Sequence, residues 1–142
     1  MDQYIEFASA HWMLITAFLA VSFFLLQDIV ETGMRKYNTI SPMLTITKLN
    51  TGHPIILDVR EAGEYNKGHI ADAIHIPVAN IEAQVNKIDL YKKDDVIVVC
   101  HTGTRSAPAC STLQKLGFEN VFLMIGGMQS WEENKLPIVK NK

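Results

Sequence analysis

The feature that most constrains the fold of this chain is an uncharged, apolar stretch near its N-terminus. Residues 7–27 are 21 positions without Asp, Glu, Lys or Arg. As an α-helix this stretch would rise about 31 Å, close to the ~30 Å hydrocarbon core of a bilayer. Its few polar residues do not form the single stripe that an amphipathic helix shows to solvent. The stretch therefore predicts a transmembrane helix over residues 7–30, with the lipid bilayer as a partner.

Two other interpretations of this stretch stay open, a helix buried in a globular core and a cleaved signal peptide. A signal peptide normally begins with basic residues and ends in small residues at a cleavage site. This chain instead begins with Asp2 and Glu6. Arg35 and Lys36 follow the apolar stretch, so the positive-inside rule predicts that the C-terminal part faces the cytoplasm.

Charge and cysteine content argue against several classes of protein. The 13 basic and 15 acidic residues give a net charge of -2, without the clustered Lys and Arg of a nucleic-acid surface. Two cysteines, Cys100 and Cys110, are too few for a disulfide framework and lack metal-ligand spacing. We therefore expect no nucleic-acid partner, no metal site and no cofactor.

Short β-rich runs alternate with helical segments from residue 38 to residue 138. This pattern is typical of an α/β domain with a central, mainly parallel sheet flanked by helices. The strongest strand signal is Asp95–Cys100, which is continuously apolar in its middle, like a buried parallel strand. Further strands are expected at 54–59, 73–76 and 121–125, and helices at 41–52, 81–88, 106–116 and around Trp131. The expected division is a tail (1–6), the transmembrane helix (7–30), a linker (31–37), the domain (38–138) and a basic tail (139–142).

A cysteine stands at the end of the strongest predicted strand, ahead of a short loop and a helix. Ligands of α/β sheets bind at the carboxyl ends of the strands, which is where Cys100 is expected. Gly103 lets the loop curl so that successive N–H groups point inward, and such a nest before a helix N-terminus holds anions and favours a thiolate. Arg105 adds a permanent positive charge. A buried cysteine that only packs is the alternative, but packing requires neither Gly103 nor Arg105.

The segment Cys100-x-x-Gly103-x-Arg105-Ser106 resembles the active-site loop of rhodanese-like domains. Three further stretches resemble signatures of that family, in the family's order: residues 58–77, Gly117-Phe118 with Val121, and Gly126-Gly127-Met128 with Trp131. The resemblance spans about residues 38–138. An apolar N-terminal helix ahead of one such domain is also found in bacterial members, so the expected location is the bacterial inner membrane.

The resemblance implies a single-domain sulfurtransferase of the rhodanese type. Cys100 would take a sulfane sulfur from thiosulfate or a related donor as a persulfide and pass it to a thiophilic acceptor, such as a thiol, cyanide or a protein. Arg105 would orient an anionic donor, while Asp58 and Arg60 would support the site as structural partners. The persulfide would be held by the backbone amides of the loop, which come from His101, Thr102, Gly103, Thr104 and Arg105.

Two other functions compete with sulfur transfer. One is a membrane-anchored interaction or sulfur-carrier module with little turnover, which the same loop residues would allow. The other is a phosphatase or arsenate reductase of the same fold. Those relatives place five residues between the cysteine and the arginine, whereas four separate Cys100 from Arg105 here. The role of His101 stays open, and for Cys110 we favour packing over a resolving thiol.

Overall fold

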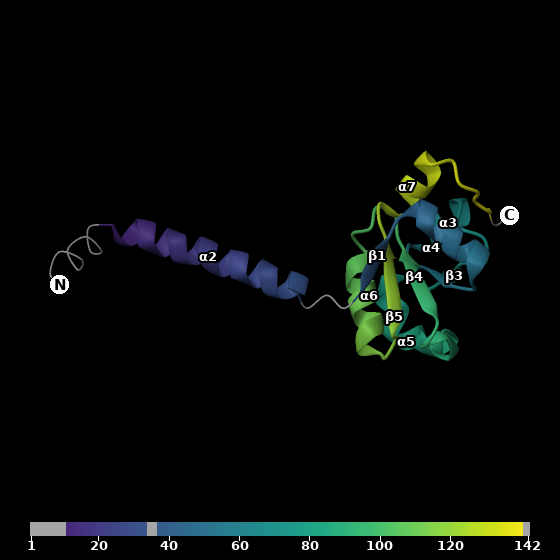
Figure 1. The fold of residues 1–142 in the computed structure, drawn as a ribbon, viewed down its shortest axis with the longest axis horizontal. Coiled ribbons are helices and arrows are strands. Elements are labelled where there is room, and N and C mark those ends of the chain that lie inside the picture. The colour runs from purple at the N-terminus through teal and green to yellow at the C-terminus, as the bar shows by residue number, and fades with distance from the viewer. Residues whose placement is uncertain (1–10, 34–36, 141–142) are drawn as a thin grey trace. The chain divides into compact units, whose positions relative to one another are not determined.

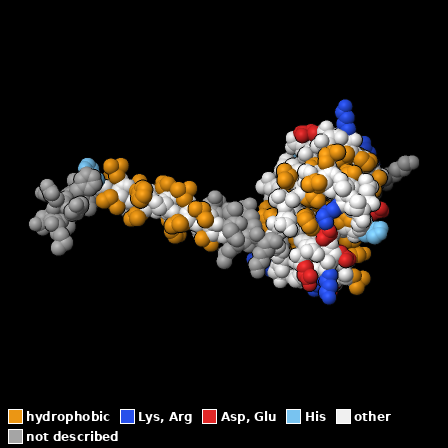
Figure 2. Space-filling view, in the orientation of Figure 1, with side chains coloured by type: hydrophobic (Ala, Val, Ile, Leu, Met, Phe, Trp, Pro, Cys, Tyr) orange, Lys and Arg blue, Asp and Glu red, His pale blue; other side chains and the backbone are white. Residues whose placement is uncertain are grey.

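The computed structural model describes residues 11–33 and 37–140. The chain divides into two compact units, Met1–Arg35 and Lys36–Lys142. The first unit contains helix α2 (Trp12–Gly33), whose apolar side chains are largely exposed along its length (Figure 2). The expected tail over residues 1–6, the basic residues Arg35 and Lys36, and residues 141–142 lie outside the described residues.

The expected transmembrane helix is not supported. Within residues 11–33 and 37–140, no helix has the length and the apolar composition that crossing a bilayer requires. This finding corrects the single-pass helix over residues 7–30 and the inner-membrane location with a cytoplasmic domain.

The second unit is an α/β domain with one five-stranded sheet (Figure 1). Its strands are β1 (Asn38–Ile40), β2 (Ile55–Asp58), β3 (Ile74–His75), β4 (Asp95–Val99) and β5 (Asn120–Met124). Its α-helices are α3 (Pro42–Thr51), α4 (Ala62–Lys67), α5 (Ile81–Gln84), α6 (Ser106–Lys115) and α7 (Gly127–Glu133). Three short 3₁₀ turns are η1 (Val78–Asn80), η2 (Val85–Lys87) and η3 (Asp89–Tyr91).

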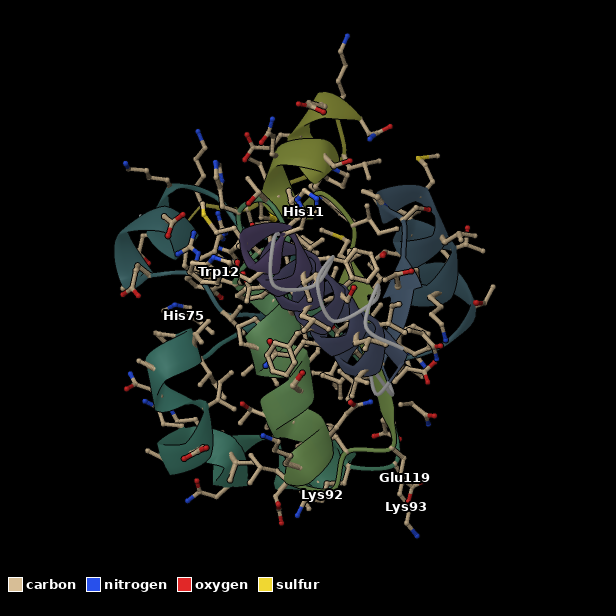
Figure 3. The ribbon with its side chains drawn as sticks, turned by 90° about the vertical axis from the view of Figure 1, so that its left-hand side faces the viewer. His11, Trp12, His75, Lys92, Lys93 and Glu119 are labelled. Atoms are coloured by element: carbon tan, nitrogen blue, oxygen red, sulfur yellow. The ribbon has the colours of Figure 1, made fainter. Side chains whose placement is uncertain are left out.

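The strands lie in the order β1-β5-β4-β2-β3, and every neighbouring pair is parallel. Val98 of the central strand β4 is in register with Leu57 of β2 and Leu123 of β5. Because the strands are parallel, their carboxyl ends share one edge of the sheet. His75 marks that edge at the end of β3, whereas Lys93 and Glu119 precede β4 and β5 at the opposite edge (Figure 3). The structure thus confirms the expected parallel α/β sheet flanked by helices.

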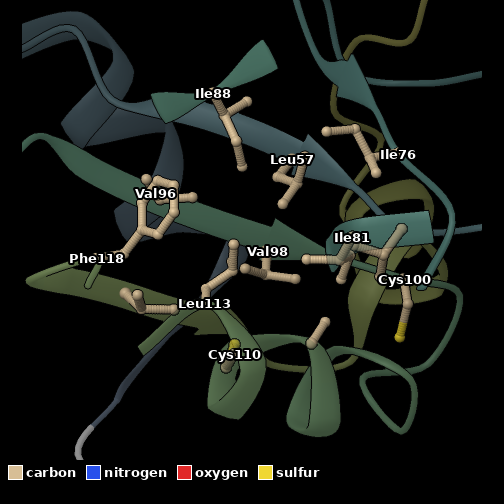
Figure 4. Packing of buried hydrophobic residues seen from close by; sticks show 13 residues of the cluster. Leu57, Ile76, Ile81, Ile88, Val96, Val98, Cys100, Cys110, Leu113 and Phe118 are labelled. Atoms are coloured by element: carbon tan, nitrogen blue, oxygen red, sulfur yellow. The ribbon is translucent and has the colours of Figure 1, made fainter. Parts of the chain in front are cut away.

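Strand β4 contributes to two apolar cores, because successive side chains of a strand point to opposite faces. Val96, Val98 and Cys100 belong to a cluster with residues of α5 and α6, and Figure 4 shows this packing. Ile97 and Val99 belong to a second cluster with residues of α7, against which α3 also packs. The sheet is therefore buried on both faces, which explains why β4 is continuously apolar.

The chemistry of the helix ends agrees with the sequence at α3 and differs along 81–88. The Ser41 side chain caps α3 by accepting a hydrogen bond from the Leu44 N–H at 3.3 Å. The segment expected as one helix over 81–88 is α5 followed by a 3₁₀ turn. Ile81 and Ile88 are nevertheless both buried, so the spacing of apolar positions predicted burial but not the type of helix. Strand β1 and helix α4 were not expected, because each is too short for a periodic signal.

Leu113 provides a test of the α6 side of the core, because its side chain has no exposed surface. We expect Leu113→Ala to lower the free energy of unfolding by about 2–5 kcal/mol through lost burial and a residual cavity. Leu90, which is 91% exposed, is the matched control. Leu90→Ala should change the free energy of unfolding by less than about 0.5 kcal/mol. Urea denaturation measures both. Equal losses in the two variants would contradict this core assignment.

Candidate active site

Cys100 directly follows β4 at the carboxyl edge of the sheet, and its side chain has no exposed surface. The residues after it form a loop that leads into α6. The N–H of Gly103 donates a hydrogen bond to Cys100 Sγ at 3.0 Å. Gly103 adopts φ +102°, a conformation that side chains with a Cβ rarely adopt. Glycine at this position therefore lets the loop turn back and place an amide on the sulfur.

Helix α7 binds this loop through hydrogen bonds to the loop carbonyls. The N–H of Met128 donates to the carbonyl oxygen of Cys100 at 2.8 Å, and the N–H of Gln129 donates to that of His101 at 3.0 Å. Gly127 permits this approach, because a Cβ there would lie 2.3 Å from the Cys100 oxygen. Gly127 also has φ +56°, so both space and backbone conformation require glycine.

These hydrogen bonds fix the direction of two peptide groups. In a trans peptide the N–H points opposite to the C=O. Because the carbonyls of Cys100 and His101 point at α7, the amides of His101 and Thr102 point away from it. The contact with α7 thus orients donor groups of the loop through its acceptor groups.

The Arg105 guanidinium is paired with a carboxylate from another part of the chain. Its Nη1 and Nη2 each donate a hydrogen bond of 2.8 Å to the carboxylate oxygens of Glu64 on α4. The hydrogen bond from Arg105 lowers the pKa of Glu64 to about 2, against the cost of partial burial. The same hydrogen bond raises the pKa of Arg105. The pair is therefore ionised throughout the neutral pH range.

Asp58 and Arg60 form a second ion pair, which is buried. Arg60 Nη2 donates to Asp58 Oδ2 at 2.6 Å and to the carbonyl oxygen of Gly68 at 2.8 Å. This pair joins the end of β2 to the turn after α4, which is a structural connection. Next to it the Tyr65 ring stacks on the rings of His69 and His75, with centroids 3.8 Å and 4.5 Å apart.

The remaining residues around the loop have mixed environments. His101, Thr102 and Thr104 are exposed. Ser106 is buried, and its hydroxyl has no hydrogen-bond partner within the described part of the chain. Cys110 is buried in the cluster on the α6 side of the sheet (Figure 4), and burial raises its pKa to about 12. Cys110 therefore stays a neutral thiol that packs.

A surface hollow lies elsewhere, lined by residues that include Lys48, His53 and Asp95. Asp95 is the first residue of β4, so this hollow is at the amino edge of the sheet. Cys100 is at the opposite end of the same strand. The chemistry of the loop therefore gives better evidence for the site than the presence of a hollow.

The structure is an α/β domain with a parallel sheet, in which a buried cysteine ends the central strand and is followed by a glycine-containing loop and an arginine at the start of the next helix. The family description "Rhodanese-like domain" matches residues 44–134, more than half of the chain. The chain belongs to the rhodanese-like domain family.

Three curated relatives show the range of proteins that carry this domain. The chain is 41% identical over 76 residues to "Putative sulfur carrier protein YrkF" of Bacillus subtilis (strain 168), a match that covers 54% of this chain but only 40% of YrkF. It is 27% identical over 143 residues to "Uncharacterized protein YibN" of Escherichia coli (strain K12), across all of both chains. It is 33% identical over 90 residues to a "Sulfurtransferase" of Allochromatium vinosum, across 63% of this chain and 82% of that protein.

A solved structure supports the family at the level of the fold. The crystal structure of a rhodanese-related protein from Thermoplasma volcanium is similar with a TM-score of 0.66 and 32% sequence identity. The match covers 74% of this chain and all of that one. The relatives thus include proteins named for sulfur transfer and for sulfur carriage, together with one uncharacterised protein that matches over its full length.

The expected site residues form two groups in the structure. The loop residues Cys100 to Arg105 lie together, and the N–H of Gly103 donates a hydrogen bond to Cys100 Sγ. Asp58 and Arg60 pair with each other instead. Sequence reasoning missed Glu64, which stands 41 residues before its partner Arg105. It also missed the contact of Gly127 with the loop. The Gly126-Gly127 pair was a visible signal, but the spacing does not reveal which backbone it approaches.

Gly127→Ala tests how α7 holds the loop. The added Cβ would overlap the Cys100 carbonyl oxygen, so we expect faster hydrogen exchange at the Met128 and Gln129 amides. Gly117→Ala is the matched control, because Gly117 also has positive φ but a Cβ added there would lie 4.0 Å from Lys92 Cε, an ordinary contact distance. It should lose about 1 kcal/mol of stability without selective change at α7. NMR-detected exchange measures both variants, and unchanged protection of the two amides in Gly127→Ala would contradict the contact.

Cys110 should be chemically inert in the folded protein. Its pKa of about 12 leaves roughly one molecule in ten thousand as thiolate at pH 8. We expect iodoacetamide to modify Cys110 at pH 8 only after denaturant is added, as peptide mass spectrometry would show. Rapid modification of Cys110 in the native protein would show that the thiol is accessible and that burial does not suppress its reactivity.

Proposed function

We propose that this protein is a sulfurtransferase that carries a sulfane sulfur as a persulfide on Cys100. The observation that carries the proposal is the position of Cys100 at the carboxyl end of β4, with the Gly103 N–H directed at its Sγ at 3.0 Å. An amide at this distance stabilises negative charge on sulfur. Membership of the rhodanese-like family and a relative named "Sulfurtransferase" support the same chemistry.

In the first step the thiolate of Cys100 attacks the outer sulfur of a donor. With thiosulfate, a new S–S bond forms to Cys100, the S–S bond of the donor breaks, and its electron pair leaves on sulfite. One thiolate and one dianion become one persulfide anion and one sulfite dianion, so charge and atoms balance. The fold supplies the nucleophile and the loop amides, and the step requires no cofactor.

In the second step an acceptor attacks the outer sulfur of the persulfide. The bond between the two sulfurs breaks, and its electron pair returns to Cys100 as a thiolate. Cyanide would leave as thiocyanate and a thiol as a persulfide, while the physiological acceptor could also be a protein thiol. The amides of His101 and Thr102, which point away from α7, are the groups we assign to the terminal sulfur, together with Gly103, Thr104 and Arg105.

A sulfur carrier with slow turnover is the second candidate. The observation that favours it is the complete burial of the Cys100 side chain, which would protect a persulfide from small acceptors. The name of YrkF, "Putative sulfur carrier protein", is consistent with this role. The two candidates share the loading step and differ in how fast cyanide removes the sulfur.

Loading of Cys100 tests the proposal. We expect protein incubated with thiosulfate or a thiol persulfide to gain one sulfur atom at Cys100 in its mass spectrum and to release thiocyanate when cyanide is added. Cys100→Ala should lose both signals completely, because it lacks the nucleophile. Cys110→Ala is the matched control and should retain most of the activity. Equal losses in the two variants would favour a two-cysteine redox mechanism, whereas loading without thiocyanate release would favour the carrier.

A further inference from the structure

The positive charge of Arg105 is already engaged before any donor arrives. Glu64 accepts a hydrogen bond from each of its two terminal nitrogens. The side chains are 38% and 33% exposed, so the pair lies at the surface beside the loop. The two hydrogen bonds use the end of the planar guanidinium, at Nη1 and Nη2, where an anion can be bound by two parallel hydrogen bonds. An anionic donor must therefore share Arg105 with Glu64 or displace it.

The neighbouring charged side chains do not give the surroundings of this pair a net positive charge. The carboxylate of Glu61 also acts on Arg105 and contributes to raising its pKa. Arg60 is matched by its partner Asp58. Together, the two positive charges of Arg60 and Arg105 and the three negative charges of Asp58, Glu61 and Glu64 give this group a net charge of -1. The N-terminus of α6 adds only about half a positive charge.

This balance has opposite consequences for different donors. Thiosulfate carries two negative charges, and the attacking thiolate adds a third. A persulfide of a small thiol carries at most one charge, on the sulfur that is transferred. Near a protein surface, adding or removing one charge a few ångströms away changes the binding or rate constant of a charged donor several-fold to tenfold or more. The neutralised arginine therefore penalises the dianion more than the persulfide.

We infer that Glu64 determines the class of donor by pairing with Arg105, so that the site favours thiol persulfides over the thiosulfate dianion. The inference rests on the proposed function. For a persulfide R–S–SH, the Cys100 thiolate attacks the outer sulfur, the S–S bond of the donor breaks, and its electron pair leaves on R–S⁻. The proton stays on the transferred sulfur until the solvent removes it. Glu64 acts through Arg105 and is a positioning residue.

The test compares how fast two donors load Cys100. We would measure the second-order rate constant of sulfur addition by mass spectrometry, with thiosulfate and with the persulfide of 2-mercaptoethanol. Glu64→Gln keeps the shape and removes the charge. We expect its rate constant with thiosulfate to rise about threefold to thirtyfold at low salt, and that with the persulfide to change by at most about threefold. The rise should shrink as salt is added, because the Debye length falls to ~8 Å at physiological ionic strength.

Two controls separate the pairing from other effects. Glu119→Gln removes one carboxylate at the opposite edge of the sheet (Figure 3) and should leave both rate constants unchanged. In the wild-type protein the rate constant with thiosulfate should rise or stay constant as salt is added, because salt screens the repulsion between the net negative site and the dianion. This readout requires no variant to fold. A steep fall with salt in the wild type would show that Arg105 attracts the dianion despite Glu64, and it would overturn the inference.

The remaining outcomes are also decisive. If Glu64→Gln slows both donors equally, the pair only holds the loop in place and the inference is wrong. An unchanged ratio of the two donors has the same meaning. If wild-type protein acquires no sulfur from either donor, the proposed function itself fails, and the inference fails with it. Failure of the donor preference and failure of sulfur transfer are therefore distinguishable.

Discussion

The contact between α7 and the loop after β4 is the interaction on which the candidate site depends. Two amides at the start of α7, those of Met128 and Gln129, bind the carbonyls of Cys100 and His101. Without a second element to donate to them, these carbonyls would be free to rotate, and the amides of the loop would rotate with them. The site therefore depends on the close approach that Gly127 allows, although Gly127 itself contributes no side chain to the chemistry.

A second set of constraints comes from charge. The buried pair of Asp58 and Arg60 connects β2 to the turn after α4, and the pair of Glu64 and Arg105 connects α4 to the start of α6. Breaking a buried pair by removing one partner is strongly destabilising, whereas an exposed pair contributes little to stability. The first pair therefore belongs to the fold. The second is free to serve selectivity, because its loss would cost the fold little.

How much the sequence could predict differs between elements for physical reasons. Strands β2 and β4 were predictable because burial on both faces requires continuous apolar runs, and α3 was predictable because Ser41 and Gly52 mark its ends. Cys100, Gly103 and Arg105 were identifiable because they are close in sequence. The pairing of Glu64 with Arg105 was not, since charged residues 41 positions apart reveal no geometry. The apolar N-terminal stretch suggested a membrane span over residues 7–30, but no helix within residues 11–33 and 37–140 has the length and the apolar composition that crossing a bilayer requires.

The alternation of side chains along β4 has a consequence for how this domain can vary. Val96, Val98 and Cys100 point to one face of the sheet, whereas Ile97 and Val99 point to the other. A shift of one residue in a strand turns every side chain to the opposite face. The position of Cys100 relative to Val96 and Val98 therefore determines the face of the sheet to which its thiol points. Insertions or deletions of a single residue within β4 would move the thiol to the α7 face, away from the loop amides. Length changes in related chains should therefore occur in the turn before Asp95. An extra residue there does not change the face of the sheet to which each side chain of β4 points.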